Sequence, residues 1–81
     1  MTGLATVAFE REKYAQAVKL ARRGVRMNPR SRPGLLLLGD AYFNLLRYHE
    51  ALAAWQRVLA IVPDDRKALK RIAHVKTKLK L

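Results

Sequence analysis

The chain contains 81 residues, of which 51% are hydrophobic and 28% are charged, and its formal net charge is +11 at pH 7. The absence of cysteine excludes disulfide bonds and thiolate metal sites, and apolar runs such as residues 35–38 are far shorter than the roughly 20 residues of a membrane span. A chain of this length forms one small domain that buries only about 60–65% of its unfolded surface. We therefore expect a soluble, cytoplasmic protein that further repeats or a partner would stabilise.

The spacing of apolar residues predicts helices along the whole chain, at residues 3–10, 14–27, 32–46, 48–62 and 65–80. Pro29 and Pro63 follow apolar periodic stretches and cannot continue a helix, so they mark the ends of the second and fourth helices. Ser31 and Asp65 are the predicted N-caps of the helices that follow them. Short turns between the helices indicate antiparallel hairpins.

The last predicted helix has one apolar side and one strongly basic side. The stripe of the apolar side consists of Leu69, Ile72, Val75, Lys76 and Leu79. Most of its basic residues lie off this stripe, namely Lys67, Lys70, Arg71, Lys78 and Lys80. A helix that packs on one side and meets water on the other is what the end of a helical stack requires. We therefore expect residues 66–81 to cap the stack.

Similar residues recur 34 positions apart through most of the chain. The pairs include Phe9 and Phe43, Tyr14 and Tyr48, Ala17 and Ala51, and Pro29 and Pro63. A period of this length is typical of stacked helical repeats. It divides the single domain, residues 1–81, into a partial repeat at 1–31, a complete repeat at 32–65 and the capping helix at 66–81.

The complete repeat resembles the tetratricopeptide repeat (TPR) family. Its matching residues are Leu35, Leu38, Gly39, Tyr42, Ala51, Trp55 and Pro63. They follow the pattern W-x2-L-G-x2-Y, A-x3-F and P, except that Leu35 replaces the tryptophan. The first part departs further, because Ala8 and Ala21 occupy its aromatic positions. The resemblance implies an all-α solenoid fragment of about two and a half helical hairpins.

Small residues in this pattern predict close helix contacts. Gly39 lies within a predicted helix, where glycine costs roughly 1 kcal/mol relative to alanine, so we expect another helix backbone to pass too close for a side chain. Ala51 fits the same interpretation, as do Ala5 and Ala73 at the positions equivalent to Gly39.

No combination of residues indicates catalysis. His49 and His74 lack a third metal ligand at a suitable spacing, and Asp64 and Asp65 open a helix, where the helix dipole explains them. Ser31 has no histidine placed by the sequence to activate it, and the four glycines form no phosphate-binding loop. We therefore expect no enzymatic activity and no cofactor.

The TPR resemblance implies a concave groove lined by the first helix of each repeat. The corresponding positions are Thr6, Phe9, Leu36, Leu37, Asp40, Phe43, Asn44, Lys67, Lys70, Arg71 and His74. This groove would be apolar in the middle and basic at one end, although Phe9, Leu36 and Leu37 fit a plain core equally well. Lys67 and Arg71 match part of the carboxylate clamp of chaperone-binding TPR domains. The other clamp positions hold Thr2, Thr6 and Leu37, so a full clamp is not expected, and a half site that prefers acidic side chains is the alternative.

Basic residues are concentrated at the two ends of the chain. Residues 11–32 contain eight basic side chains and one acid, and residues 66–81 contain seven basic side chains and none that are acidic. Such a field attracts anionic partners, although a solvated surface explains most of these charges. We expect a protein-interaction scaffold that binds a peptide or helical segment with apolar and acidic residues. The alternatives are binding of a polyanion, such as RNA or an acidic membrane, and self-association through exposed repeat ends around Leu4 and Val7. Nucleic acid is disfavoured because stacking aromatics are scarce.

Overall fold

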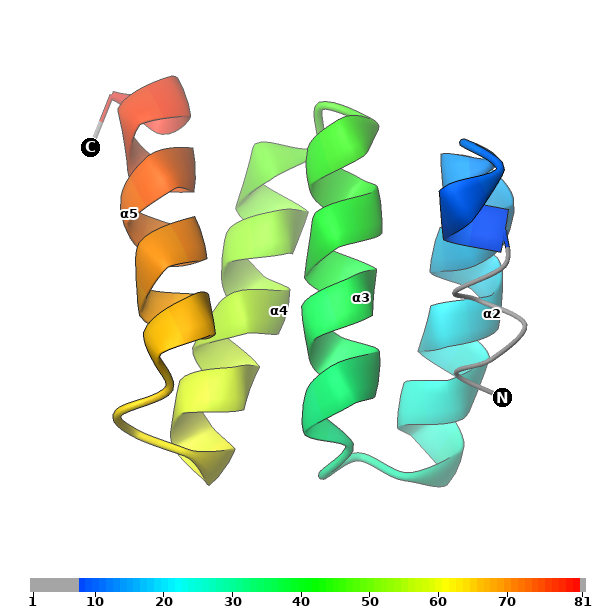
Figure 1. Ribbon diagram of the computed structural model, residues 1–81, viewed down its shortest axis with the longest axis horizontal. Coiled ribbons are helices and arrows are strands. Elements are labelled where there is room, and N and C mark those ends of the chain that lie inside the picture. Colours follow the sequence, from blue (N-terminus) through cyan, green and yellow to red (C-terminus); the bar gives the residue numbers. More distant parts are fainter. Residues whose placement is uncertain (1–7, 81) are drawn as a thin grey trace.

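The computed structural model describes residues 8–80, and all regular structure in this part of the chain is helical. Residues 8–10 are helical and are followed by α2 (Tyr14–Met27), α3 (Arg32–Asn44), α4 (Tyr48–Ile61) and α5 (Arg66–Leu79) (Figure 1). The all-α prediction is confirmed, and the predicted ends of these four helices lie within two residues of the observed ones. Most of the first predicted helix, with Leu4, Ala5, Thr6 and Val7, lies outside the described residues.

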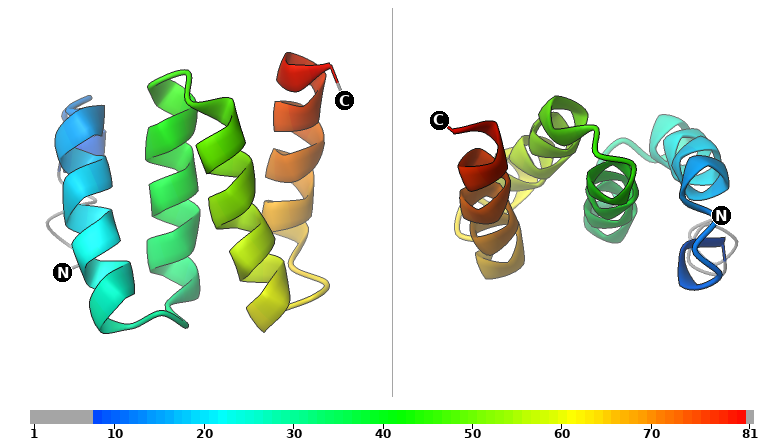
Figure 2. Two further views of the ribbon diagram at one scale, coloured as in Figure 1. Left: turned by 180° about the vertical axis from the view of Figure 1, so that it is seen from behind. Right: turned by 90° about the horizontal axis from the view of Figure 1, so that it is seen from above.

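The helices form two layers, seen most clearly from above (Figure 2). Helices α2 and α4 lie in one layer, and α3 and α5 lie in the other. Helix α3 packs against both α2 and α4, and α4 packs in turn against α5. This alternation gives the molecule two faces, one formed by α3 and α5 and the other by α2 and α4.

The turn that ends α3 has a counterpart at the equivalent position of the preceding repeat. The N–H of Arg47 donates to the carbonyl of Tyr42 at 2.9 Å and that of Leu46 donates to Phe43 at 3.0 Å, which is the Schellman pattern. The same two bonds recur one repeat earlier, from Lys13 to Ala8 and from Glu12 to Phe9, both at 2.9 Å. Glycine usually occupies the left-handed position of such a turn.

Here that position is filled by residues with a Cβ. The non-glycine residues with positive φ in the described chain are Glu12 at 61°, Leu46 at 64° and Lys80 at 58°, which occupy equivalent positions of successive repeats. The predicted third helix ends at Asn44, two residues early, because this turn closes it. The backbone period therefore extends over all three parts of the chain.

Replacing Leu46 by glycine should stabilise the protein. A left-handed conformation costs an L-residue roughly 1–2 kcal/mol, and glycine avoids this cost. Glycine also loses about 0.5–1 kcal/mol more backbone entropy on folding, which offsets part of the gain. The leucine side chain is 71% exposed, so little packing is lost with it. We expect the free energy of unfolding of Leu46→Gly to rise by about 0.5–1 kcal/mol in urea titrations. Leu46→Ala, which keeps the Cβ, is the matched control and should gain nothing. A glycine variant less stable than the alanine variant would contradict this account of the turn.

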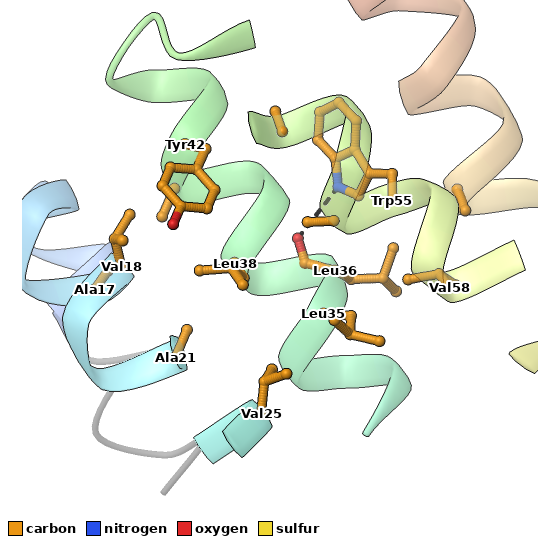
Figure 3. Close-up of a cluster of buried hydrophobic side chains, with 14 of the residues drawn as sticks. Ala17, Val18, Ala21, Val25, Leu35, Leu36, Leu38, Tyr42, Trp55 and Val58 are labelled. Atoms are coloured by element: carbon orange, nitrogen blue, oxygen red, sulfur yellow. Dashed lines mark hydrogen bonds between the residues drawn. The ribbon is translucent and has the colours of Figure 1, made fainter. Parts of the chain in front are cut away.

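The core lies between the layers and centres on Trp55. The most completely buried large side chains are Trp55, Leu35, Val58 and Val75. Figure 3 shows the core between α2, α3 and α4, where Val18 faces Tyr42 and Val25 lies near Leu35. The indole N–H of Trp55 donates to the carbonyl of Leu36 in a long hydrogen bond of 3.4 Å.

Gly39 makes room for the Trp55 side chain. A methyl group built on Gly39 would lie 2.6 Å from Cδ1 and 2.7 Å from Cε2 of the indole, which is closer than atoms pack. The expectation that a helix backbone passes here was therefore wrong in one respect, because the neighbour is a flat ring. Ala51 is fully buried as expected, but Ala73 is exposed, because no helix among the described residues packs on that side of α5.

Gly39→Ala should destabilise the protein even though alanine favours helix. The added methyl overlaps a buried ring that cannot move freely, so we expect a loss of about 1–3 kcal/mol in the free energy of unfolding. Gly39→Leu should cost at least as much. The matched test is a double-mutant cycle with Trp55→Leu, in which the cost of Gly39→Ala should shrink once the ring is gone. An unchanged cost in the Trp55→Leu background would show that the strain arises elsewhere.

Both predicted N-caps are confirmed. The Oγ of Ser31 accepts a hydrogen bond from the N–H of Gly34 at 3.2 Å, and Oδ1 of Asp65 accepts one from Ala68 at 3.0 Å. Asp65 is only 4% exposed, and its other carboxylate oxygen accepts a hydrogen bond from Arg32, the first residue of α3. This ion pair joins the start of α3 to the start of α5.

The Asp65 contacts predict how stability depends on pH. The hydrogen bond from Arg32, followed by that from the Ala68 N–H, lowers the pKa of Asp65 below its ordinary value. Its contribution to stability is therefore complete above about pH 4 and is lost as the pH falls through the lowered pKa of the folded state. Asp65→Asn, which keeps a capping oxygen, should flatten the loss of unfolding free energy below about pH 4. The neighbouring Asp64→Asn is the control, and an equal flattening in that variant would refute the assignment.

Candidate peptide-binding groove

A pocket of about 280 Å³ opens on the face formed by α3 and α5. The lining residues are Phe9, Asp40, Phe43, Asn44, Trp55, Lys70, Arg71 and His74. Seven of these were predicted from the sequence as groove residues, and they come from three separate segments of the chain. We call this pocket and the exposed side chains of α5 beside it the groove.

Phe43 is the aromatic centre of the groove. Its ring centroid lies 5.3 Å from that of His74 on α5 and 6.0 Å from that of Trp55 on α4. The ring centroids of Phe43 and Tyr48 lie 5.2 Å apart, and those of Phe9 and Tyr14, in the preceding repeat, lie 5.3 Å apart. Each Phe–Tyr pair connects the end of one helix to the start of the next, so the period places Phe9 and Phe43 at equivalent positions.

Asp40 and Arg71 form an ion pair across the groove. Nε of Arg71 lies 2.7 Å from Oδ1 of Asp40, and its Nη2 lies 3.4 Å from Oδ2. Burial raises the pKa of Asp40 above its ordinary value, and the hydrogen bond from Arg71 opposes this shift. Two predicted site residues thus neutralise each other, and the pair fixes α5 relative to α3.

The remaining cations of this region are exposed lysines. Lys67 and Lys70 are exposed on α5, and Lys70 lines the pocket whereas Lys67 does not. The carbonyl of Lys67 accepts a hydrogen bond from Nη1 of Arg71 at 3.4 Å. The basic end of the groove therefore consists mainly of ammonium groups that no carboxylate within residues 8–80 neutralises.

The remaining predicted groove residues are buried, already hydrogen-bonded or outside the described part of the chain. Leu36 is 8% exposed and belongs to the core, and Leu37 is partly buried against that core. Asn44 lines the pocket, but its amide already donates to the carbonyl of Asp40 at 2.8 Å. Thr6 and Thr2 lie outside the described residues.

Trp55 was not predicted to line the groove. Its match to the repeat pattern assigned it to the helix interface, which it does fill. Its ring is also reached from the pocket between α3 and α5. The absence of a side chain at Gly39 was the sequence signal that could have placed the indole against α3.

Residues 33–65 match the tetratricopeptide repeat family. This segment is therefore similar to a tetratricopeptide repeat, and the resemblance found in the sequence is confirmed there. Proteins of the family are scaffolds that generally mediate protein–protein interactions. The match covers α3, α4 and the turn that leads to α5.

The chain is also similar to human Intraflagellar transport protein 70A. The two sequences are 36% identical over 52 residues, which is 64% of this chain and 8% of that protein. The chain thus matches only a small part of this relative's length.

Within residues 8–80, no helix is both long enough and apolar enough to cross a bilayer. The same residues contain no group of three or more histidine, aspartate or glutamate side chains arranged to hold a metal ion.

Proposed function

We propose that the chain is a protein-interaction scaffold that binds a peptide or helical segment of a partner protein in the groove. The observation that supports this most strongly is the convergence of Phe9, Phe43 and His74, from three repeats, on one pocket. Asp40 and Arg71 are satisfied by each other, which favours a role in shaping the groove over a role in chemistry. Such a scaffold would have no enzymatic activity and would act in the cytoplasm.

The partner segment should carry apolar and acidic residues. Burying one leucine or phenylalanine contributes about 1.5–3 kcal/mol, whereas one exposed ion pair contributes about 0.2–1 kcal/mol. Contact with the partly exposed Phe43 would therefore supply most of the affinity. The lysines of α5 would mainly speed association with an acidic segment and fix its direction.

Two alternatives predicted from the sequence each have a structural observation in their favour. The exposed basic side of α5, with Lys67, Lys70, Lys76, Lys78 and Lys80, favours a polyanion. Leu69, which is exposed on α5, favours self-association through a repeat end. Both enter the following test as competing outcomes.

The test uses peptides selected from a random library on the immobilised protein, with their kinetics measured by surface plasmon resonance. Phe43→Ala should weaken binding about tenfold or more, mainly by faster dissociation. Lys67→Glu/Lys70→Glu should slow association with acidic peptides. Lys13→Glu/Arg23→Glu, which carries the same charge change on exposed positions at and before α2, is the control and should bind like the parent.

Binding of Phe43→Ala at parental strength, with an unchanged circular dichroism spectrum, would refute the groove as the binding site. A log–log salt slope near −4 to −5 would instead indicate neutralisation of about five phosphates and favour the polyanion. Dimers in sedimentation experiments that dissociate in the Leu69→Lys variant would favour self-association.

A further inference from the structure

The face formed by α2 and α4 carries a second pocket, larger than the groove and on the opposite side of the molecule. It has a volume of about 500 Å³ and is lined by residues of α2, α3 and α4 and by Pro29. Helix α3 packs against both neighbours, and the space between α2 and α4 stays open above it. We call it the arginine pocket after the residues of its rim.

The floor of the arginine pocket is apolar. Leu38 and Tyr42 lie one turn apart on α3, and Val25 of α2 also lines the pocket. The wall on α4 is formed partly by Ala53 and Ala54, whose small side chains leave the pocket open. A floor of this kind can bury one apolar side chain of a ligand.

Three arginines surround this apolar floor. Arg22 and Arg26 lie four residues apart on one side of α2, and Arg57 lies across the pocket on α4. All three are exposed, and none forms an ion pair within residues 8–80. Glu50 is the acidic residue at this rim, and its Oε2 lies 3.6 Å from Nη1 of Arg47, which is outside the pocket. Its ion pair is therefore with Arg47 and not with the three arginines of the rim. The rim therefore has positive charge that the described protein does not neutralise, in contrast to Arg71 in the groove.

We propose that the arginine pocket is a second docking surface, which takes an acidic peptide segment of a partner protein with one apolar side chain inserted between α2 and α4. Carboxylates on either side of that side chain would meet Arg22 and Arg26 on one rim and Arg57 on the other. This inference goes beyond the proposed function, because it concerns the other face and does not depend on the groove.

A protein segment fits this pocket better than a nucleic acid does. Single-stranded nucleic acids bind by stacking their bases on exposed aromatic rings. Tyr42 is the aromatic residue among those that line the pocket, and it is only 8% exposed. Guanidinium groups form bidentate hydrogen bonds with carboxylates as well as with phosphates, so the arginines alone do not distinguish a peptide from a nucleic acid. The apolar floor does, because it suits an apolar side chain of a peptide.

The experiment measures binding of a labelled synthetic peptide, with one phenylalanine flanked by glutamates, by fluorescence anisotropy. Arg22→Glu/Arg57→Glu should weaken binding about tenfold or more, because two attractions become repulsions. The control is Arg23→Glu/Arg66→Glu, two exposed arginines outside the pocket, which lowers the formal net charge equally, from +11 to +7. Binding by this control should stay within about twofold of the parent.

A second pair of variants tests the apolar floor. Ala53→Leu fills the pocket from an exposed position and should weaken binding severalfold, whereas Ala73→Leu adds the same exposed leucine on α5 and should not. Replacing the phenylalanine of the peptide by serine should weaken binding comparably. In the amide spectrum of the labelled protein, the largest shifts should fall on Ala53, Ala54 and their neighbours.

Several outcomes would overturn the proposal. Equal losses in the two double arginine variants would show attraction by net charge alone, and equal binding of the serine peptide would exclude insertion into the pocket. Loss in Lys67→Glu/Lys70→Glu but not in Arg22→Glu/Arg57→Glu would place the peptide in the groove instead. Tighter binding of oligouridine, with the same dependence on Arg22 and Arg57, would identify a nucleic-acid site. No binding of the peptide at millimolar concentration would also refute it.

Discussion

The contact between Trp55 and Gly39 determines how the helices of this protein come together. Because position 39 has no Cβ, the indole of α4 can lie flat against α3, and any side chain there would push the two helices apart. The same ring is reached from the pocket between α3 and α5, where it lies 6.0 Å from Phe43. One packing interaction therefore joins the core of the hairpin to the candidate binding surface.

The 34-residue repeat and the ion pairs contribute to this helix packing in different ways. The repeat period places equivalent turns at Glu12 and Leu46 and equivalent aromatic pairs at Phe9 and Phe43, so α2 and α4 begin in a similar way. The ion pairs of Arg32 with Asp65 and of Arg71 with Asp40 then attach α5 to α3. Charges that no such pair satisfies remain at the lysines of α5 and around the arginine pocket, and both proposed docking surfaces depend on them.

Much of this could be predicted from the sequence, because it depends on local chemistry or on the period. Apolar spacing predicted the helices, Ser31 and Asp65 were recognised as caps by residue type and position, and the resemblance to the repeat family placed Phe43 and His74 on one surface. The division into a partial repeat, a complete repeat and a capping helix remains a prediction. The Asp40–Arg71 and Arg32–Asp65 pairs could not be predicted, since each joins side chains far apart in the sequence whose meeting depends on helix packing. The left-handed turn at Leu46 was missed because glycine, its usual signal, is absent.

We propose that a partner binds on the face of α3 and α5, where the pocket is lined in part by the buried Trp55 ring. Trp55 is the single tryptophan of the chain, so its indole N–H gives one resonance that reports on this site. The most direct measurement is to follow that resonance while a library-selected peptide is added to saturation. If the partner binds in the groove, the indole signal should shift progressively together with those of Phe43 and His74. An indole signal that stays in place at saturating peptide, while resonances elsewhere shift, would contradict this proposal.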